Sequence, residues 1–169
     1  DFVVLCRSRD EAEAALATVR EGVQANGLTL HPDKTHIGDC RVPGQGFEFL
    51  GYRFEAGRRW VRKKSLDRLK DKVRDKTRRT RGDSLARVID DLNPALKGWF
   101  GYFKHAYHTT FAEVDGFVRR RLRALLRKQE KRPGAGRCHA DHRRWTNAFF
   151  AGEGLFALHT AYLLARDPR

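Results

Sequence analysis

The sequence of 169 residues contains no methionine, only three cysteines and no long uncharged apolar run. Cys6, Cys40 and Cys138 form no Cys-x-x-Cys pair and leave an odd one over, which argues against a disulfide framework or a four-cysteine zinc site. The missing apolar run argues against a membrane-spanning helix. Because the cysteines suggest no disulfide framework, we expect the protein to work in a reducing cytoplasm. Because residues 1–6 read as the middle of a strand rather than as a signal peptide or a natural start, we also expect a fragment.

Motifs of several enzyme classes are also missing. The sequence has no Walker loop, no Gly-x-Gly-x-x-Gly and no Gly-x-Ser-x-Gly, so triphosphatase, dinucleotide-binding and serine-hydrolase functions have no support. Residues 138–142, Cys-His-Ala-Asp-His, hold metal-ligand atoms close in sequence, but their spacing is too compressed for unstrained tetrahedral geometry. Spacing alone therefore predicts no complete active site.

Positive charge is concentrated in the middle of the chain. The formal net charge of +14 divides into −3 for residues 1–56, +15 for residues 57–132 and +2 for residues 133–169. A solvated, salt-bridged helical surface is the alternative interpretation of such a charge run, but the central block has too few acids to neutralise itself. The excess favours a polyanionic partner, and nucleic acid above others.

The sequence of residues 1–62 predicts a small region that contains both a helix and strands. The residues after Ser8 and Asp10 have the apolar periodicity of a helix, which Gly27 ends. Four segments have the character of strands, at residues 2–6, 28–31, 35–37 and 47–54. Residues 58–61 can return beside the last of these as a hairpin.

The remainder of the chain predicts basic, amphipathic helices. Ser65 can cap the first of them, Asn93 and Pro94 read as the N-cap and first residue of another, and Thr110 with Glu113 forms a capping box. Their apolar stripes predict a three-helix bundle. A linker and two short closing helices are expected at residues 133–136, 145–150 and 155–164. The expected fold class is α+β, a small sheet with one helix followed by a basic helical bundle.

Several short motifs occur in the order found in one family. Residues 1–6, Asp-Phe-Val-Val-Leu-Cys, resemble the second half of the Tyr-Ala-Asp-Asp hairpin of bacterial group II intron reverse transcriptases, with Asp1 as its second aspartate. Residues 27–35 resemble the palm segment that follows, and Phe49-Leu50-Gly51-Tyr52 resembles the primer-grip strand. The helical half is similar to the maturase-specific thumb, domain X, at residues 92–94, 98–103, 119–128, 145–150 and 154–156.

The resemblance implies a domain organisation and a function. Residues 1–62 would be the C-terminal part of the palm, residues 63–132 the basic thumb, and residues 133–169 the linker and closing helices of the maturase domain. The parent protein would be an RNA-directed DNA polymerase and intron splicing factor, and its partners group II intron RNA and an RNA template–DNA primer duplex. The alternative is a non-enzymatic RNA-binding or ribonucleoprotein module.

The same resemblance bears on catalysis. Two-metal phosphoryl transfer needs several carboxylates to hold two Mg²⁺ ions. Asp1 is the single such ligand that the resemblance places in this chain, so we expect the fragment to be inactive alone and Mg²⁺ to bind only in the complete enzyme. Lys34 resembles a lysine that can protonate the leaving pyrophosphate, although a structural lysine at a strand end is the alternative.

The predicted binding residues are mostly basic, because A-form RNA is read mainly through its phosphates, its 2′-hydroxyls and its shape. Trp60 is the candidate for base stacking, whereas the aromatic residues at 99, 100, 103 and 117 lie on apolar stripes and are expected in the core. The predicted nucleic-acid contacts are Arg58, Arg59, Trp60, Arg62, Lys63, Lys64, Arg68, Lys72, Arg79, Arg120, Arg123, Arg127, Lys128, Lys131, Arg143 and Arg144.

Overall fold

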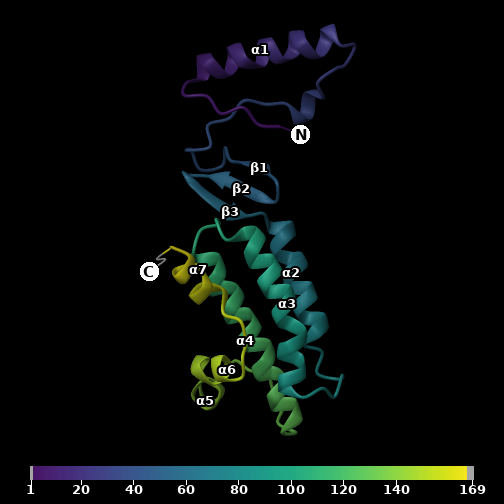
Figure 1. Cartoon of the computed structure of the whole chain (residues 1–169), viewed down its shortest axis with the longest axis vertical. Helices are drawn as coiled ribbons and strands as arrows, with labels where there is room; N and C mark the ends of the chain where they lie inside the picture. The colour runs from purple at the N-terminus through teal and green to yellow at the C-terminus, as the bar shows by residue number, and fades with distance from the viewer. Residues whose placement is uncertain (1, 167–169) are drawn as a thin grey trace. The chain divides into compact units, whose positions relative to one another are not determined.

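The computed structural model describes residues 2–166, so Asp1 lies outside the described residues. Helices and strands both occur (Figure 1), which confirms the α+β class. The elements are α1 (Arg9–Ala25), the 3-10 helix η1 (Pro32–Lys34), β1 (Phe47–Phe49), β2 (Tyr52–Glu55), β3 (Arg58–Val61), α2 (Lys63–Lys76), α3 (Leu85–Phe103), α4 (Thr109–Gln129), α5 (His139–Arg144), α6 (Asn147–Gly152) and α7 (Leu158–Arg166).

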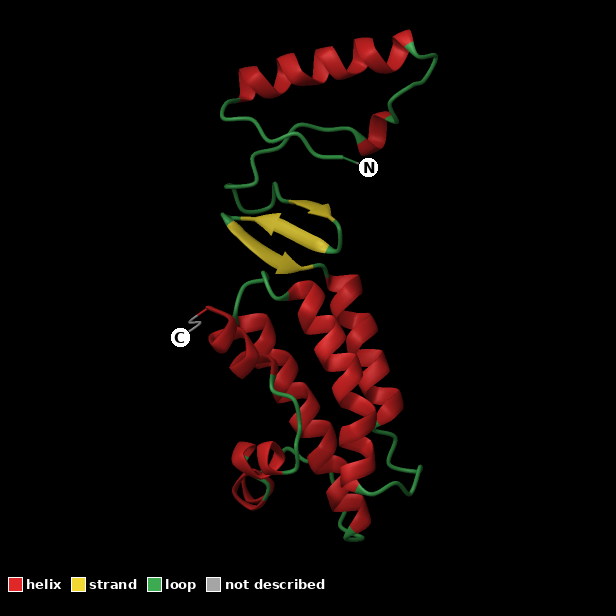
Figure 2. Cartoon of the chain, viewed as in Figure 1, coloured by secondary structure: helices red, strands yellow, loops and turns green. Residues whose placement is uncertain are grey.

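The strands form one small sheet in the order β1-β2-β3, drawn in yellow in Figure 2. The chain divides into two compact units, Asp1–Arg58 and Arg59–Arg169, and the second is called the helical unit below. Within residues 2–166, no helix is both long enough and apolar enough to cross a membrane.

The first unit confirms one predicted helix and corrects three predicted strands. The Ser8 hydroxyl accepts a hydrogen bond from the Glu11 N–H at the start of α1, and Gly27 follows its end with φ at 68°. The predictions of strands at residues 2–6, 28–31 and 35–37 are wrong. A strand exists only through hydrogen bonds to a neighbouring strand, and among residues 2–166 these segments have no such neighbour.

The predicted strand at residues 47–54 is a hairpin. Leu50 and Gly51 have positive φ angles of 48° and 80°, which a two-residue primed turn requires at both of its central positions. Phe49 therefore pairs with Tyr52 across the turn, and the rings of Phe47 and Phe54 stack with centroids 5.0 Å apart. The predicted return strand at residues 58–61 is confirmed as β3.

The helical unit contains the predicted three-helix bundle of α2, α3 and α4. Its buried apolar side chains recur at helical spacing, which puts one face of each helix into a shared core. They include Leu69 and Val73 on α2, Val88, Ile89, Leu92 and Leu96 on α3, and Phe111, Val114, Val118, Leu122 and Leu125 on α4.

Two predicted helix starts are wrong. The helix α2 begins at Lys63 with Arg62 as its N-cap, so Ser65 lies inside the first turn and caps nothing. The helix α4 begins at Thr109, and Thr110 is buried, so no capping box with Glu113 forms there. In both cases the N-cap residue, Arg62 or His108, makes no side-chain cap hydrogen bond.

The predicted break at Asn93 and Pro94 does not occur. The helix α3 runs from Leu85 to Phe103 with Pro94 inside it, and its N-cap is Ser84, whose hydroxyl accepts from the Arg87 N–H at 3.3 Å. The Asn93 side chain does not cap a helix. Its Nδ2 donates to the Gly154 carbonyl at 2.9 Å, and its Oδ1 accepts from the Phe156 N–H at 2.8 Å.

A second side chain holds the start of α7. Asp115 on α4 is 5% exposed, and its carboxylate accepts the N–H groups of Leu158 at 2.9 Å and His159 at 3.1 Å. These are the first two N–H groups of α7, which have no partner inside the helix, so Asp115 caps α7 from α4. Burial nevertheless raises the pKa of Asp115 above its ordinary value.

Candidate nucleic-acid interface

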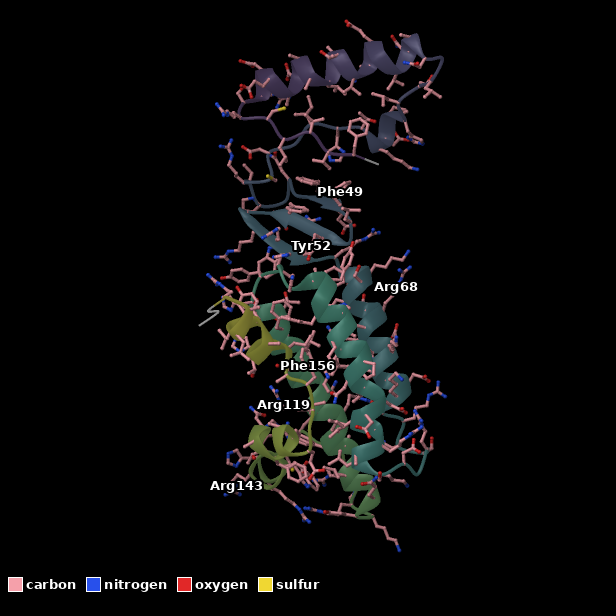
Figure 3. The ribbon with its side chains drawn as sticks, in the orientation of Figure 1. Phe49, Tyr52, Arg68, Arg119, Arg143 and Phe156 are labelled. Carbon is pink, nitrogen blue, oxygen red and sulfur yellow. The ribbon has the colours of Figure 1, made fainter. Side chains whose placement is uncertain are left out.

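Three cations on α2 are available to a ligand. Lys64, Arg68 and Lys72 follow one another at four-residue intervals, and all three are exposed. Among the residues that the structure describes, none of the three has an ion-pair or hydrogen-bond partner through its side chain. Arg68 extends outward from α2 in Figure 3. We call Lys64, Arg68 and Lys72 the α2 row.

Other bases of the same helix are neutralised locally. Lys63 pairs with Asp67 at 2.9 Å, Arg74 with Asp71 at 2.6 Å, and Arg78, just past the helix, with Asp75 at 2.8 Å. The hydrogen bond from Lys63 lowers the pKa of Asp67. Such exposed pairs contribute little stability, but they place an acid beside each of these bases. Lys70 and Lys76 are half-buried on the same helix, so the α2 row comprises the exposed cations of α2 for which the described residues supply no acidic partner.

Arg123, one of the predicted nucleic-acid contacts, is not on the solvated surface of its helix. Arg123 is 3% exposed, its Nε donates to the Trp145 carbonyl at 2.9 Å, and its guanidinium lies over the Phe150 ring. Burial lowers the pKa of this guanidinium. The segment from Trp145 to Phe150 covers this part of α4, so Arg123 acts in the core.

Arg127 is also committed to the fold. Its Nη1 lies 2.7 Å from Oδ1 of Asp141, a carboxylate that is 1% exposed, and its guanidinium also donates to the Pro133 carbonyl. The chain can approach α4 here because Gly136 has φ at 71° and no side chain; a Cβ would lie 2.7 Å from the Ala124 nitrogen. Arg127 thus holds residues 133–141 against α4.

Three more arginines make contacts within the helical unit. Arg121, inside α4, donates to Oγ1 and the carbonyl of Thr77 and so ties the end of α2 to α4. Arg79, which lies in the turn after α2 rather than on the helix, donates to the Gly134 carbonyl at 3.2 Å. Arg144 pairs with Glu130 at 2.6 Å. Arg79 and Arg144 are therefore partly occupied, unlike the α2 row.

A second group of exposed cations lies in the last turn of α4 and in the segments that follow it. Lys128, Lys131 and Arg143 are exposed, and within residues 2–166 their side chains have no acidic partner. Figure 3 shows Arg143 on the opposite side of the helical unit from Arg68. Arg120 is half-buried with its guanidinium 5.2 Å from the Phe117 ring centroid. The structure therefore does not gather all the predicted bases on one face.

The aromatic residues expected in the core do pack within the helical unit. Phe103 is 6% exposed, and its ring centroid lies 4.9 Å from that of the half-buried Trp99. Phe100 contacts Phe111 edge to face at 5.4 Å, and Phe117 lies beneath two guanidinium groups. These contacts support core packing over base stacking.

Trp60 is placed differently. Its side chain is half-buried, and its ring centroid lies 4.8 Å from that of Tyr107. Arg59 beside it is exposed, and both Arg58 and Arg62 make contacts within the protein. This end of the helical unit thus combines ring surface with positive charge.

The predicted site residues of the first unit lie on two separate elements. Lys34 is exposed at the end of η1. The predicted primer grip spans the hairpin turn, where Leu50 is 66% exposed and Phe49 and Tyr52 are half-buried (Figure 3).

Sequence reasoning missed the residues that hold the helical unit in shape. Asn93, Asp115 and Arg121 each bond to a segment at least 43 residues away. The buried polar character of Asp115 has no signal in the sequence, since an aspartate in the middle of an amphipathic helix reads as a surface residue. The Asn93-Pro94 pair is a recognisable sequence signal, but it predicts a helix start rather than the hydrogen bonds that Asn93 makes to Gly154 and Phe156.

Comparison with known proteins finds a family match for part of the helical unit. Residues 66–145 match the family model for the group II intron, maturase-specific domain. The matched segment includes Arg68 and Lys72 of the α2 row, all of α3 and α4, and Asp141 with its partner Arg127. A comparison with curated proteins found no significant match. The C-terminal region of the chain is therefore of the group II intron maturase type.

Proposed function

We propose that the helical unit binds group II intron RNA and assists its splicing, with the α2 row as the main contact. The proposal is carried by one observation: a region of the maturase type contains a row of exposed cations that no acid of the described chain neutralises. Folded RNA presents phosphates at high density, and cations that replace its counterions supply most of the binding free energy.

The spacing of the α2 row supports contacts to the RNA backbone. Four residues of an α-helix rise by about 6 Å, so the row presents cations at regular intervals along α2. Lys64 and Lys72 have flexible stems that reach phosphates without a fixed angle, whereas Arg68 can bind a phosphate through two N–H groups. Such contacts read the position of the backbone rather than the base sequence.

A wider proposal rests on the motifs of the first unit. In the complete protein, the palm end and the helical unit would hold an RNA template–DNA primer duplex for RNA-directed DNA synthesis, with the hairpin turn at Leu50 and Gly51 as primer grip and Lys34 near the leaving pyrophosphate. Asp1 would then help to hold Mg²⁺, which acts as the Lewis acid of phosphoryl transfer. The alternative of a non-enzymatic RNA-binding module uses the same α2 row.

A salt series tests the assignment of the α2 row. The variant carries Lys64→Gln, Arg68→Gln and Lys72→Gln, and the control carries Arg7→Gln, Arg9→Gln and Arg20→Gln, which removes the same charge from exposed positions in and just before α1. If each cation of the row neutralises one phosphate, the slope of log K against log salt should fall by roughly 0.9 for each phosphate that the variant leaves unneutralised.

The control should keep nearly the slope of the unmodified protein, because its substitutions lie outside the helical unit. Equal losses of affinity in the two variants would show that overall charge, not the α2 row, drives binding. An unchanged slope in the α2-row variant would contradict the proposal. For the wider proposal, residues 1–169 alone should not extend a primer on an RNA template with Mg²⁺, and template-dependent extension would refute that expectation.

A further inference from the structure

Four aromatic rings follow one another in the helical unit, where β3 lies against the connection between α3 and α4. The ring centroids are 4.8 Å apart for Trp60 and Tyr107, 4.5 Å for Tyr107 and His108, and 6.3 Å for His108 and Tyr162. All four side chains are half-buried. We call these four residues the aromatic run; each keeps part of its surface in contact with solvent.

A backbone hydrogen bond at Tyr107 and a buried ring beside Tyr162 fix the position of the aromatic run. The Tyr107 N–H donates to the Arg59 carbonyl at 2.7 Å, which fixes the α3–α4 connection beside β3. At the other end, the Tyr162 ring lies 5.1 Å from that of Phe111, which is fully buried. The rings are therefore oriented before any ligand arrives, so little conformational entropy is lost when one binds.

Positive charge accompanies these rings. Arg59 and Lys104 are exposed at the two segments that the Tyr107 backbone bond joins. Arg166 donates to the Tyr162 hydroxyl at 2.9 Å, and its guanidinium lies 5.6 Å from the centroid of that ring. A ligand that suits this surface has flat, apolar faces joined by negative charges.

We propose that the aromatic run is a stacking site for unpaired bases of RNA, separate from the backbone contacts of the α2 row. Bases within a duplex present their faces only to each other, whereas single-stranded loops and ends expose them to aromatic rings. Trp60 has the largest ring and the strongest stacking surface of the four. The inference rests on the proposed RNA-binding function and adds the kind of RNA segment that this second site takes.

The test compares two probes and two variants. The probes are an unstructured uridine octamer and a twelve-base-pair RNA duplex of mixed sequence. Trp60→Leu removes the aromatic face but keeps an apolar side chain, and Trp60→Phe keeps a ring. Trp60→Leu should weaken octamer binding by about tenfold, in the range found when one base loses its stacking partner, and change duplex binding less than twofold. Trp60→Phe should keep most of the octamer affinity.

Tyr162→Leu is a second variant that keeps the test decisive if Trp60→Leu unfolds, and melting temperatures identify any unfolded variant. Equal losses of affinity on both probes, or octamer binding that neither leucine variant weakens, would overturn the stacking site and leave the rings as packing residues. Failure of the proposed function is distinguishable, because it appears as duplex binding that the α2-row variant leaves unchanged. Absence of octamer binding by the unmodified chain overturns the stacking site alone.

Discussion

Replacement of Asn93 by aspartate separates two interpretations of the Asn-Pro pair. At a helix N-cap, aspartate and asparagine are about equally favourable, so a cap predicts almost no change in stability. In the structure, Asn93 Nδ2 donates to the Gly154 carbonyl and Oδ1 accepts from the Phe156 N–H. Aspartate keeps the acceptor but places a carboxylate oxygen opposite a carbonyl oxygen. The structure therefore predicts a loss of stability.

The magnitude follows from the bonds that change. One hydrogen bond contributes about 0.5–1.5 kcal/mol net, and Gly154 is exposed, so water can reach its carbonyl once the bond is broken. With the repulsion between the two oxygens, Asn93→Asp should lower the free energy of unfolding by about 1–2 kcal/mol. Asn93→Ala, which removes both bonds, should cost about 1–3 kcal/mol.

Urea denaturation at neutral pH measures these differences, and the m-value should not change. Ser84 provides the control, because its hydroxyl caps α3 in the structure. Ser84→Ala should cost about 1 kcal/mol, whereas Ser84→Asp should be nearly neutral. If Asn93→Asp is as stable as the unmodified protein while Asn93→Ala is not, Asn93 is a cap after all and the interaction with residues 154–156 is wrong.

The remaining predictions concern the segment after α4. Arg127→Met should lower the urea midpoint more than Lys128→Met, because the first leaves the buried Asp141 carboxylate without its cation while Lys128 is exposed. Burial raises the pKa of Asp141, but hydrogen bonds from Cys138 and Arg127 outweigh it and leave the pKa below its ordinary value. The stability from this pair is thus present at neutral pH and disappears as pH falls below about 4. The difference in midpoint between the Arg127→Met variant and the unmodified protein should therefore shrink there, but it should not vanish, because the substitution also removes the hydrogen bonds to the Pro133 carbonyl at every pH. Trp145→Ala should lower the free energy of unfolding by about 3–5 kcal/mol, since Trp145 is 5% exposed. Phe149→Ala should lower it by less, because Phe149 is half-buried. Equal melting temperatures for the two variants would refute this difference.

Local patterns were sufficient for α1, for the buried faces of the bundle helices and for the overall charge, but they misplaced helix starts at Ser65, Asn93 and Thr110. Apolar residues at helical spacing predicted α1 and the bundle of α2, α3 and α4, because burial of one face is the main source of helix stability in a protein. Ser8 and Gly27 marked the ends of α1 through contacts within one turn. The concentration of bases between residues 57 and 132 is a property of composition and needs no structure.

Tertiary structure alone decided which bases are available to a ligand. Arg123 and Arg68 have the same charge and both lie on amphipathic helices, yet one is buried against Trp145 and the other is exposed. The difference depends on a segment 22 residues further along the chain, which folds back over α4. The predictions of strands at residues 2–6, 28–31 and 35–37 failed for a related reason, since a strand requires a partner elsewhere in the chain. Apolar periodicity predicts which face of a helix is buried, whereas the partner of a given side chain depends on which other segments of the chain fold against that face.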